Sequence, residues 1–181
     1  DVSTKPVSDL EKQKISSLCN AYLDMSDEPN TKYCAINGLK SHGENCLMAA
    51  TLNVLKNNPN VTPVLNDVKR IFKFSSRSIL EQTFNDNEYD NLFGKFVFKK
   101  RIPTWMHNKE ISDLLITRMF SMCPSLIDTY LEVIRKNIPV IQQGFDTEHA
   151  HFHNIPKEYL VELDQIHCFG WLSGNGNIEY Y

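Results

Sequence analysis

The chain has 181 residues, a formal net charge of −3 and 41% hydrophobic residues, which are ordinary values for a globular protein. A length close to the roughly 150 residues of a typical domain favours one domain with a sizeable core. The weak negative charge argues against a basic nucleic-acid-binding protein, and no apolar run approaches the roughly 18 residues of a membrane span. We therefore expect a single domain over residues 1–181, with neither a nucleic acid nor a membrane as its partner.

The chain begins without an initiator methionine and without the apolar segment of a secretory signal, so we expect a fragment of a longer protein from a reducing compartment. Its five cysteines form no Cys-x-x-Cys pair. This spacing argues against a four-cysteine zinc site and favours free thiols. The sequence thus predicts neither a metal nor a cofactor.

The first part of the chain is predicted to be helical. Apolar spacing indicates an amphipathic helix over residues 8–23, followed by a polar turn over 24–32. Residues 40–45 read as a loop with Gly43 near its centre. Residues 46–56 are apolar on almost every side, which is typical of a buried helix.

The middle of the chain continues this helical pattern with one exception. Thr62 and Pro63 are typical of a helix start, and the apolar face that follows runs to Phe72. The alternation of residues 95–101 predicts a strand. Further helices are predicted over residues 78–84, from Asn108 to Met122, and from Pro124 to Asn137.

From residue 138 onward the apolar period changes from the helical value to two. Strands are predicted over residues 138–143, 159–163, 167–172 and 178–181. Residues 173–177 predict a hairpin turn centred on Asn175 and Gly176, which would pair Gly174 with Asn177. We therefore expect an α+β fold with a helical part over residues 1–137 and a β part over residues 138–181.

Cys46 is the strongest candidate for a nucleophile. It follows a polar loop and begins an apolar helix, whose free amides and dipole favour a thiolate. Cys123, which precedes Pro124, is its only rival among the cysteines. The alternative is that Cys46 is a small core residue, which is the common role of a free cysteine.

A thiolate also needs an imidazole within hydrogen-bond reach, at any separation in the sequence. His167 opens a predicted strand, which would hold its ring rigidly. His42 lies only four residues before Cys46, too close in the chain for the usual base. A metal cluster is the competing interpretation for three histidines at period two, namely His149, His151 and His153.

Asn45-Cys46 before an apolar helix, together with the segment from His167 to Gly176 far downstream, resembles the papain-like cysteine proteases of viruses. The resemblance is strongest to the leader proteases of foot-and-mouth disease viruses and extends to the papain-like proteases of nidoviruses. It implies a helical lobe that carries Cys46 on a central helix and an antiparallel β lobe that carries His167. It also implies that Cys46 attacks the scissile carbonyl while His167 protonates the leaving amine.

The resemblance further implies that the backbone N–H of Cys46 and the side chain of Ser41 stabilise the oxyanion. In these proteases an Asp beyond the hairpin orients the histidine, and that position falls at or past Tyr181, whereas Asn177 and Glu179 are nearer candidates. The implied function is cleavage of a viral polyprotein in the host cytoplasm by a monomeric enzyme. Ubiquitin or a ubiquitin-like modifier on host proteins is a further implied substrate.

Two other interpretations stay open at this stage. The chain could be a non-catalytic protein-binding domain in which Cys46 only fills the core. It could also be a metal-binding protein that uses the His149, His151 and His153 cluster.

Overall fold

The computed structural model describes residues 7–19, 22–25, 27–59, 62–75, 78–105, 111–171 and 178–181. Its α-helices are α1 (Asp9–Ser16), α2 (Pro29–Ile36), α3 (Lys40–Asn57), α4 (Thr62–Asp67), α5 (Ile127–Gln142) and α6 (Thr147–Asn154). Its strands are β1 (Ile71–Phe74), β2 (Ser78–Leu80), β3 (Phe96–Lys99), β4 (Ile102–Trp105), β5 (Ile111–Leu114), β6 (Met119–Met122), β7 (Leu160–Leu163), β8 (Cys168–Trp171) and β9 (Ile178–Tyr180). Three short 3₁₀ helices are η1 (Asp86–Tyr89), η2 (Pro124–Leu126) and η3 (Lys157–Tyr159).

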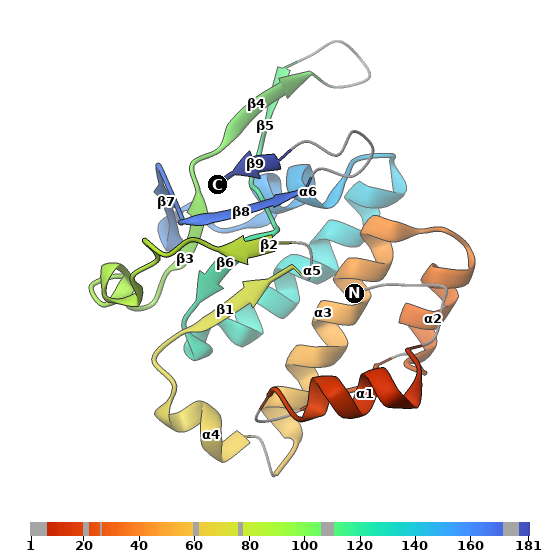
Figure 1. Cartoon of the computed structure of the whole chain (residues 1–181). Helices are drawn as coiled ribbons and strands as arrows, with labels where there is room; N and C mark the ends of the chain where they lie inside the picture. Colours follow the sequence, from red (N-terminus) through yellow and green to blue (C-terminus); the bar gives the residue numbers. More distant parts are fainter. Residues whose placement is uncertain are drawn as a thin grey trace.

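The strands form three sheets, and the whole is an α+β arrangement as the sequence predicts (Figure 1). The largest sheet has the order β1-β6-β3-β7, with antiparallel neighbours except for the parallel pair β3–β7. An antiparallel sheet has the order β2-β8-β9, and β4 pairs with β5 as a hairpin. Within the described residues, no helix combines the length and the apolar character needed to cross a membrane.

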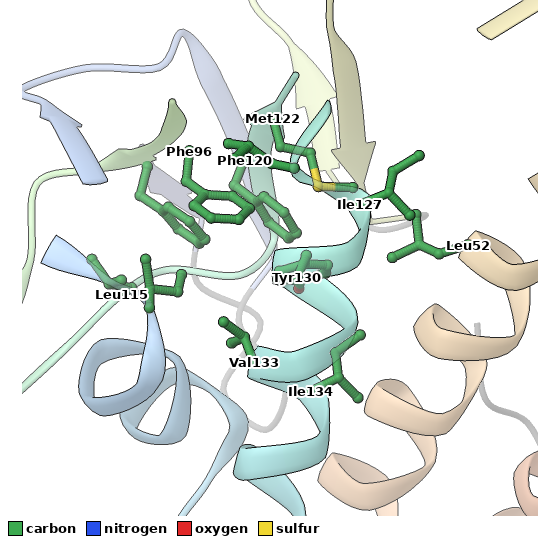
Figure 2. Packing of buried hydrophobic residues seen from close by; sticks show 12 residues of the cluster. Leu52, Phe96, Leu115, Phe120, Met122, Ile127, Tyr130, Val133 and Ile134 are labelled. Carbon is green, nitrogen blue, oxygen red and sulfur yellow. The ribbon is translucent and has the colours of Figure 1, made fainter. Parts of the chain in front are cut away.

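The main core lies between the four-stranded sheet and helices α3 and α5 (Figure 2). Phe96, Val97 and Phe98 of β3 are at most 1% exposed, as expected for a central strand covered on both faces. Phe98 stacks on Phe120 of β6 with ring centroids 4.6 Å apart. Helix α5 contributes a stripe at helical spacing, and α3 contributes Leu52.

A buried polar network joins α3, α5 and α6 beside this core. His151 of α6 donates from Nδ1 to the carbonyl of Thr147 (2.7 Å) and accepts at Nε2 from the Tyr130 hydroxyl (2.7 Å). The amide of Asn137 in α5 lies 3.1 Å from that of Asn45 in α3, which donates to Thr147 Oγ1 at 3.1 Å. Buried polar groups left without partners are costly, so this network fixes how the three helices pack.

Several predicted elements differ in the structure. Residues 138–143 lie in or at the end of α5 instead of a strand, because the buried stripe of α5 continues at helical spacing from Val133 and Ile134 to Asn137. The predicted division of the chain at residue 137 into helices and strands is therefore wrong, because β1 to β6 all precede α5. Short apolar runs fit helix and strand alike, and pairing with distant strands decided their state.

The same cause explains two further differences. Residues 78–80 form β2, which pairs with β8, and the predicted helix up to Met122 is replaced by β5 and β6. The start of that predicted helix, Asn108, lies outside the described residues.

The predicted strands at residues 95–101, 159–163, 167–172 and 178–181 are confirmed as β3, β7, β8 and β9. The predicted turn, residues 173–177, lies outside the described residues. Trp171 pairs with Ile178, whereas the predicted register would pair it with Tyr180. A shift of two residues keeps every side chain on its predicted face, so the period-two pattern could not distinguish the two registers.

The buried imidazole of His151 makes stability depend on pH. Burial lowers its pKa from 6.5 to about 4, so the unfolded chain binds a proton between these values and the folded chain does not. Stability from this residue is present above pH 6.5 and is lost as the pH falls toward 4. Between pH 7 and pH 5 the loss amounts to about 2 kcal/mol.

We therefore expect urea unfolding to show a smaller loss of stability from pH 7 to pH 5 in His151→Gln than in the wild type, by about 2 kcal/mol. The exposed His153 on the same helix provides the matched control, His153→Gln, which should keep the wild-type slope. Equal slopes in the wild type and His151→Gln would contradict the prediction.

Candidate functional site

The segment around Cys46 is a pair of helices joined by a tight turn. Glu28 caps α2 by accepting from the Thr31 N–H at 2.6 Å. At the other end of α2, Leu39 N–H donates to the Cys34 carbonyl at 2.9 Å, and Gly38 has a φ of 68°. This is the Schellman arrangement, whose left-handed position favours a residue without a Cβ. It directs the chain straight into α3.

Helix α3 begins at Lys40, so the loop predicted over residues 40–45 is helical. The Schellman turn ends α2, and the residues from Lys40 onward form the next helix. The polar composition of residues 40–45 did not reveal this. Cys46 therefore lies within α3, two turns from its start, and not at the helix terminus. Its N–H is used in the helix, because only the first four N–H groups of an α-helix lack an acceptor within it.

Three side chains of this helix pair meet at one point. Sγ of Cys34, an imidazole nitrogen of His42 and Sγ of Cys46 all lie within 4.8 Å of one another. His42 and Cys46 are four residues apart on α3 and share a face, while Cys34 approaches from α2. Cys34 is buried, and His42 and Cys46 are half-buried, so the cluster is reachable from one side.

This environment does not favour a thiolate at Cys46. Burial, together with the neighbouring Cys34 and Glu28, raises the pKa of the Cys46 thiol to about 11. The thiol is therefore protonated at neutral pH, in contrast to the thiolate that a helix terminus would stabilise. Efficient attack by Cys46 at neutral pH therefore needs a base that removes the proton as the sulfur attacks.

His167 occupies a different environment. It has a φ of 53° at the entry to β8, its Nδ1 lies 3.1 Å from Thr83 Oγ1, and its Nε2 lies 3.9 Å from Glu88. No hydrogen bond or ion pair in the described structure joins His167 to Cys46. The structure thus brings Cys46 together with His42, not with His167.

The other predicted site residues are placed as follows. Ser41 lies in the first turn of α3, and its carbonyl accepts from the Asn45 side chain at 2.9 Å and from Thr147 Oγ1 at 3.2 Å. Glu179 accepts from the Tyr181 hydroxyl at 3.0 Å. Asn177 lies outside the described residues.

The alternative metal cluster of His149, His151 and His153 does not form a ligand set. These residues are in α6, where positions two apart point to different sides of the helix. His151 uses both ring nitrogens in hydrogen bonds, His149 lies 2.5 Å from Asp146 through Nδ1, and His153 is exposed. The period-two interpretation fails because the segment is helical.

Cys123, the rival nucleophile, is a buried residue without an imidazole neighbour in the described chain. Its Sγ accepts from the Gly94 N–H at 3.0 Å and lies 3.7 Å from Nη2 of Arg70. It lines a cavity of about 420 Å³ together with Arg70 and Tyr89. Cys123 is only 1% exposed, which is typical of a structural thiol.

Sequence reasoning missed Cys34 entirely and set His42 aside. A signal was present, because His42 and Cys46 have the spacing of neighbours on one helix face. It could be read only if residues 40–45 were helical. Cys34 joins them through the contact between α2 and α3, which spacing alone does not show.

Comparison of the chain with protein-family models, with curated proteins and with solved structures finds no match.

The crowded thiols give a direct prediction for chemical labelling. In the presence of a chelator, alkylation of Cys46 by iodoacetamide should rise about tenfold per pH unit from pH 7 to pH 9, because only the thiolate reacts. Cys34→Ala should accelerate the labelling of Cys46 at pH 8, since Cys34 helps to raise the pKa of Cys46. Peptide mass spectrometry follows each site, and Cys123→Ala, a change away from the cluster, should have no effect. A rate that levels off near pH 7 would show an activated thiolate instead.

Proposed function

We propose that the chain is a thiol-dependent hydrolase of polypeptide amide bonds, with Cys46 as the nucleophile and His42 as the general base. The observation that carries this proposal is the placement of a half-buried Cys46 thiol within 4.8 Å of a histidine nitrogen. The resemblance of Asn45-Cys46 and the apolar helix after it to papain-like proteases supports the same nucleophile. A papain-like fold and a viral source are parts of this proposal.

The proposed first step transfers one proton. His42 takes the proton of the Cys46 thiol as the sulfur attacks the scissile carbonyl, and the imidazolium then gives that proton to the leaving amine. The products are a thioester on Cys46 and a free amine. Water then cleaves the thioester and restores the thiol. The separation of up to 4.8 Å must shorten when substrate binds, as is common for catalytic hydrogen bonds in free enzymes.

The first turn of α3 supplies donors for the oxyanion. The N–H groups of Ser41 and His42 have no hydrogen-bond partner within the described structure, whereas those of Lys40 and Gly43 are bonded. Side chains on a helix lean toward its N-terminus, so the side chain of Cys46 lies over the turn that carries His42. We assign this role to the N–H groups of Ser41 and His42, in place of the N–H of Cys46 and of the Ser41 side chain, which lies on the face of α3 that carries Asn45.

Exposed apolar side chains on the same helix pair suit a polypeptide substrate. Tyr33 and Ile36 of α2 are 61% and 72% exposed, and Leu39 in the turn is 40% exposed. We propose that these side chains contact the substrate polypeptide. The substrates to test are a viral polyprotein and host proteins that carry a ubiquitin-like modifier.

The test compares single variants on a fluorogenic amide of ubiquitin and on a mixture of peptide amides. We expect Cys46→Ala to abolish hydrolysis and His42→Gln to lower kcat by about 10²–10⁴, the usual contribution of a general base. His167→Gln should change kcat far less, because His167 contacts Thr83 and Glu88 instead.

The outcomes separate the alternatives. A larger loss in His167→Gln than in His42→Gln would overturn the assignment of the base. Hydrolysis that survives Cys46→Ala would overturn the nucleophile. A wild-type chain that folds but hydrolyses none of these substrates would favour the non-catalytic binding domain.

A further inference from the structure

The three side chains that meet at Cys46 have the chemistry of a metal site. Two thiols and one imidazole are ligands that Zn²⁺ prefers, and two thiolates would balance the charge of a divalent ion. In a tetrahedral zinc site with bonds of about 2.0–2.3 Å, neighbouring ligand atoms are about 3.5 Å apart. The described atoms lie within 4.8 Å of one another, so closing the site needs shifts of about 1 Å.

The backbone around the cluster holds the ligands in place. His42 and Cys46 lie one turn apart on the same face of α3. Cys34 lies at the end of α2, where its own carbonyl accepts the closing hydrogen bond of the Schellman turn from Leu39. A site whose ligands come from two helices joined by one short, bonded turn loses little conformational entropy on binding an ion.

From this geometry we infer that Cys34, His42 and Cys46 bind a divalent transition-metal ion of the zinc type, with the fourth position open to water. Glu28 has an electrostatic effect on Cys46, but its carboxylate oxygens already accept from Thr31 and Asn30 at the start of α2. A site with three protein ligands and one water is open, not closed.

A bound divalent ion would stabilise the thiolate forms of Cys34 and Cys46. The Cys34 sulfur lies beside the Cys46 sulfur and contributes, after burial, to the raised pKa of the Cys46 thiol. A divalent ion between them reverses this, since it stabilises both thiolates and releases about two protons. The protons go to solvent, and no redox partner is needed.

The ion would bind to Cys46 and His42, the two side chains that the proposed hydrolase uses. Zn²⁺ would hold Cys46 as a bound thiolate and would take the imidazole nitrogen of His42 that removes the proton. Bound metal should therefore switch off hydrolysis. This inhibitory role rests on the proposed function, whereas metal binding itself rests only on the geometry.

The first experiment measures binding without using activity. The full chain is purified with a chelator, dialysed and titrated with Co²⁺ and then with Zn²⁺. We expect a thiolate-to-cobalt charge-transfer band, the visible bands of tetrahedral cobalt, and their loss when Zn²⁺ displaces cobalt. Cys34→Ser, His42→Gln and Cys46→Ser should each weaken metal affinity by more than about 100-fold, since loss of even an outer partner costs 10–100-fold.

Matched controls are the buried cysteines away from the cluster, Cys123→Ser and Cys168→Ser, which should keep the cobalt bands. Circular dichroism confirms that each variant is folded. Absence of the bands in the folded wild type would overturn the inference, and so would bands that survive Cys34→Ser but vanish in Cys123→Ser.

The second experiment tests the inhibitory role. Zn²⁺ should lower the hydrolysis rate of the wild type by about tenfold or more at saturation, and should change the rate of Cys34→Ser far less relative to its own metal-free rate. If the cobalt bands form but the metal-free chain shows no hydrolysis in the presence of chelator, the proposed function is refuted and the metal site stands. Hydrolysis without cobalt bands would do the reverse, and hydrolysis unaffected by bound zinc would overturn the inhibitory role.

Discussion

The packing of α3, α5 and α6 depends on a buried hydrogen-bond network, and the position of the candidate site depends on that packing. Asn45 is 2% exposed and Asn137 is completely buried, so neither amide can turn to water for a partner. Besides the Ser41 carbonyl on its own helix, Asn45 bonds to Thr147 of α6 and to Asn137 of α5, and these contacts fix the rotation of α3 about its axis. Because Asn45 points inward, the adjacent Cys46 is turned toward α2 and the surface.

The direction of Cys46 explains why its surroundings differ from those of a thiol at a helix terminus. Turned toward α2, Cys46 meets Cys34 and His42 at one point. Burial and the neighbouring Cys34 raise the pKa of the Cys46 thiol, while the imidazole can accept a proton or hold an ion. The proposed hydrolysis and the inferred metal binding would thus compete for one cluster, and the presence of a divalent ion would decide between them.

The sheets hold the other half of the expected dyad in a different environment. β8 lies between β2 and β9, and Leu80 of β2 pairs with Cys168, directly after His167. The neighbouring Glu81 N–H donates to the His167 carbonyl at 2.9 Å, so the backbone of His167 is tied to the segment after β2. Its ring then meets Thr83 and Glu88 from the same segment, so the His167 side chain is held beside the residues that follow β2.

The sequence by itself determined the α+β class, the strands β3, β7, β8 and β9, and Cys46 as the cysteine to examine. These features depend on local periodicity, which is written along the chain. Only the tertiary structure decided that residues 78–80 and 111–114 are strands and that α5 continues past residue 137, because pairing and burial outweigh weak local preference. It alone joined Cys34 to His42 and Cys46, since a cluster of side chains from two helices depends on the turn between them and on the rotation of each helix.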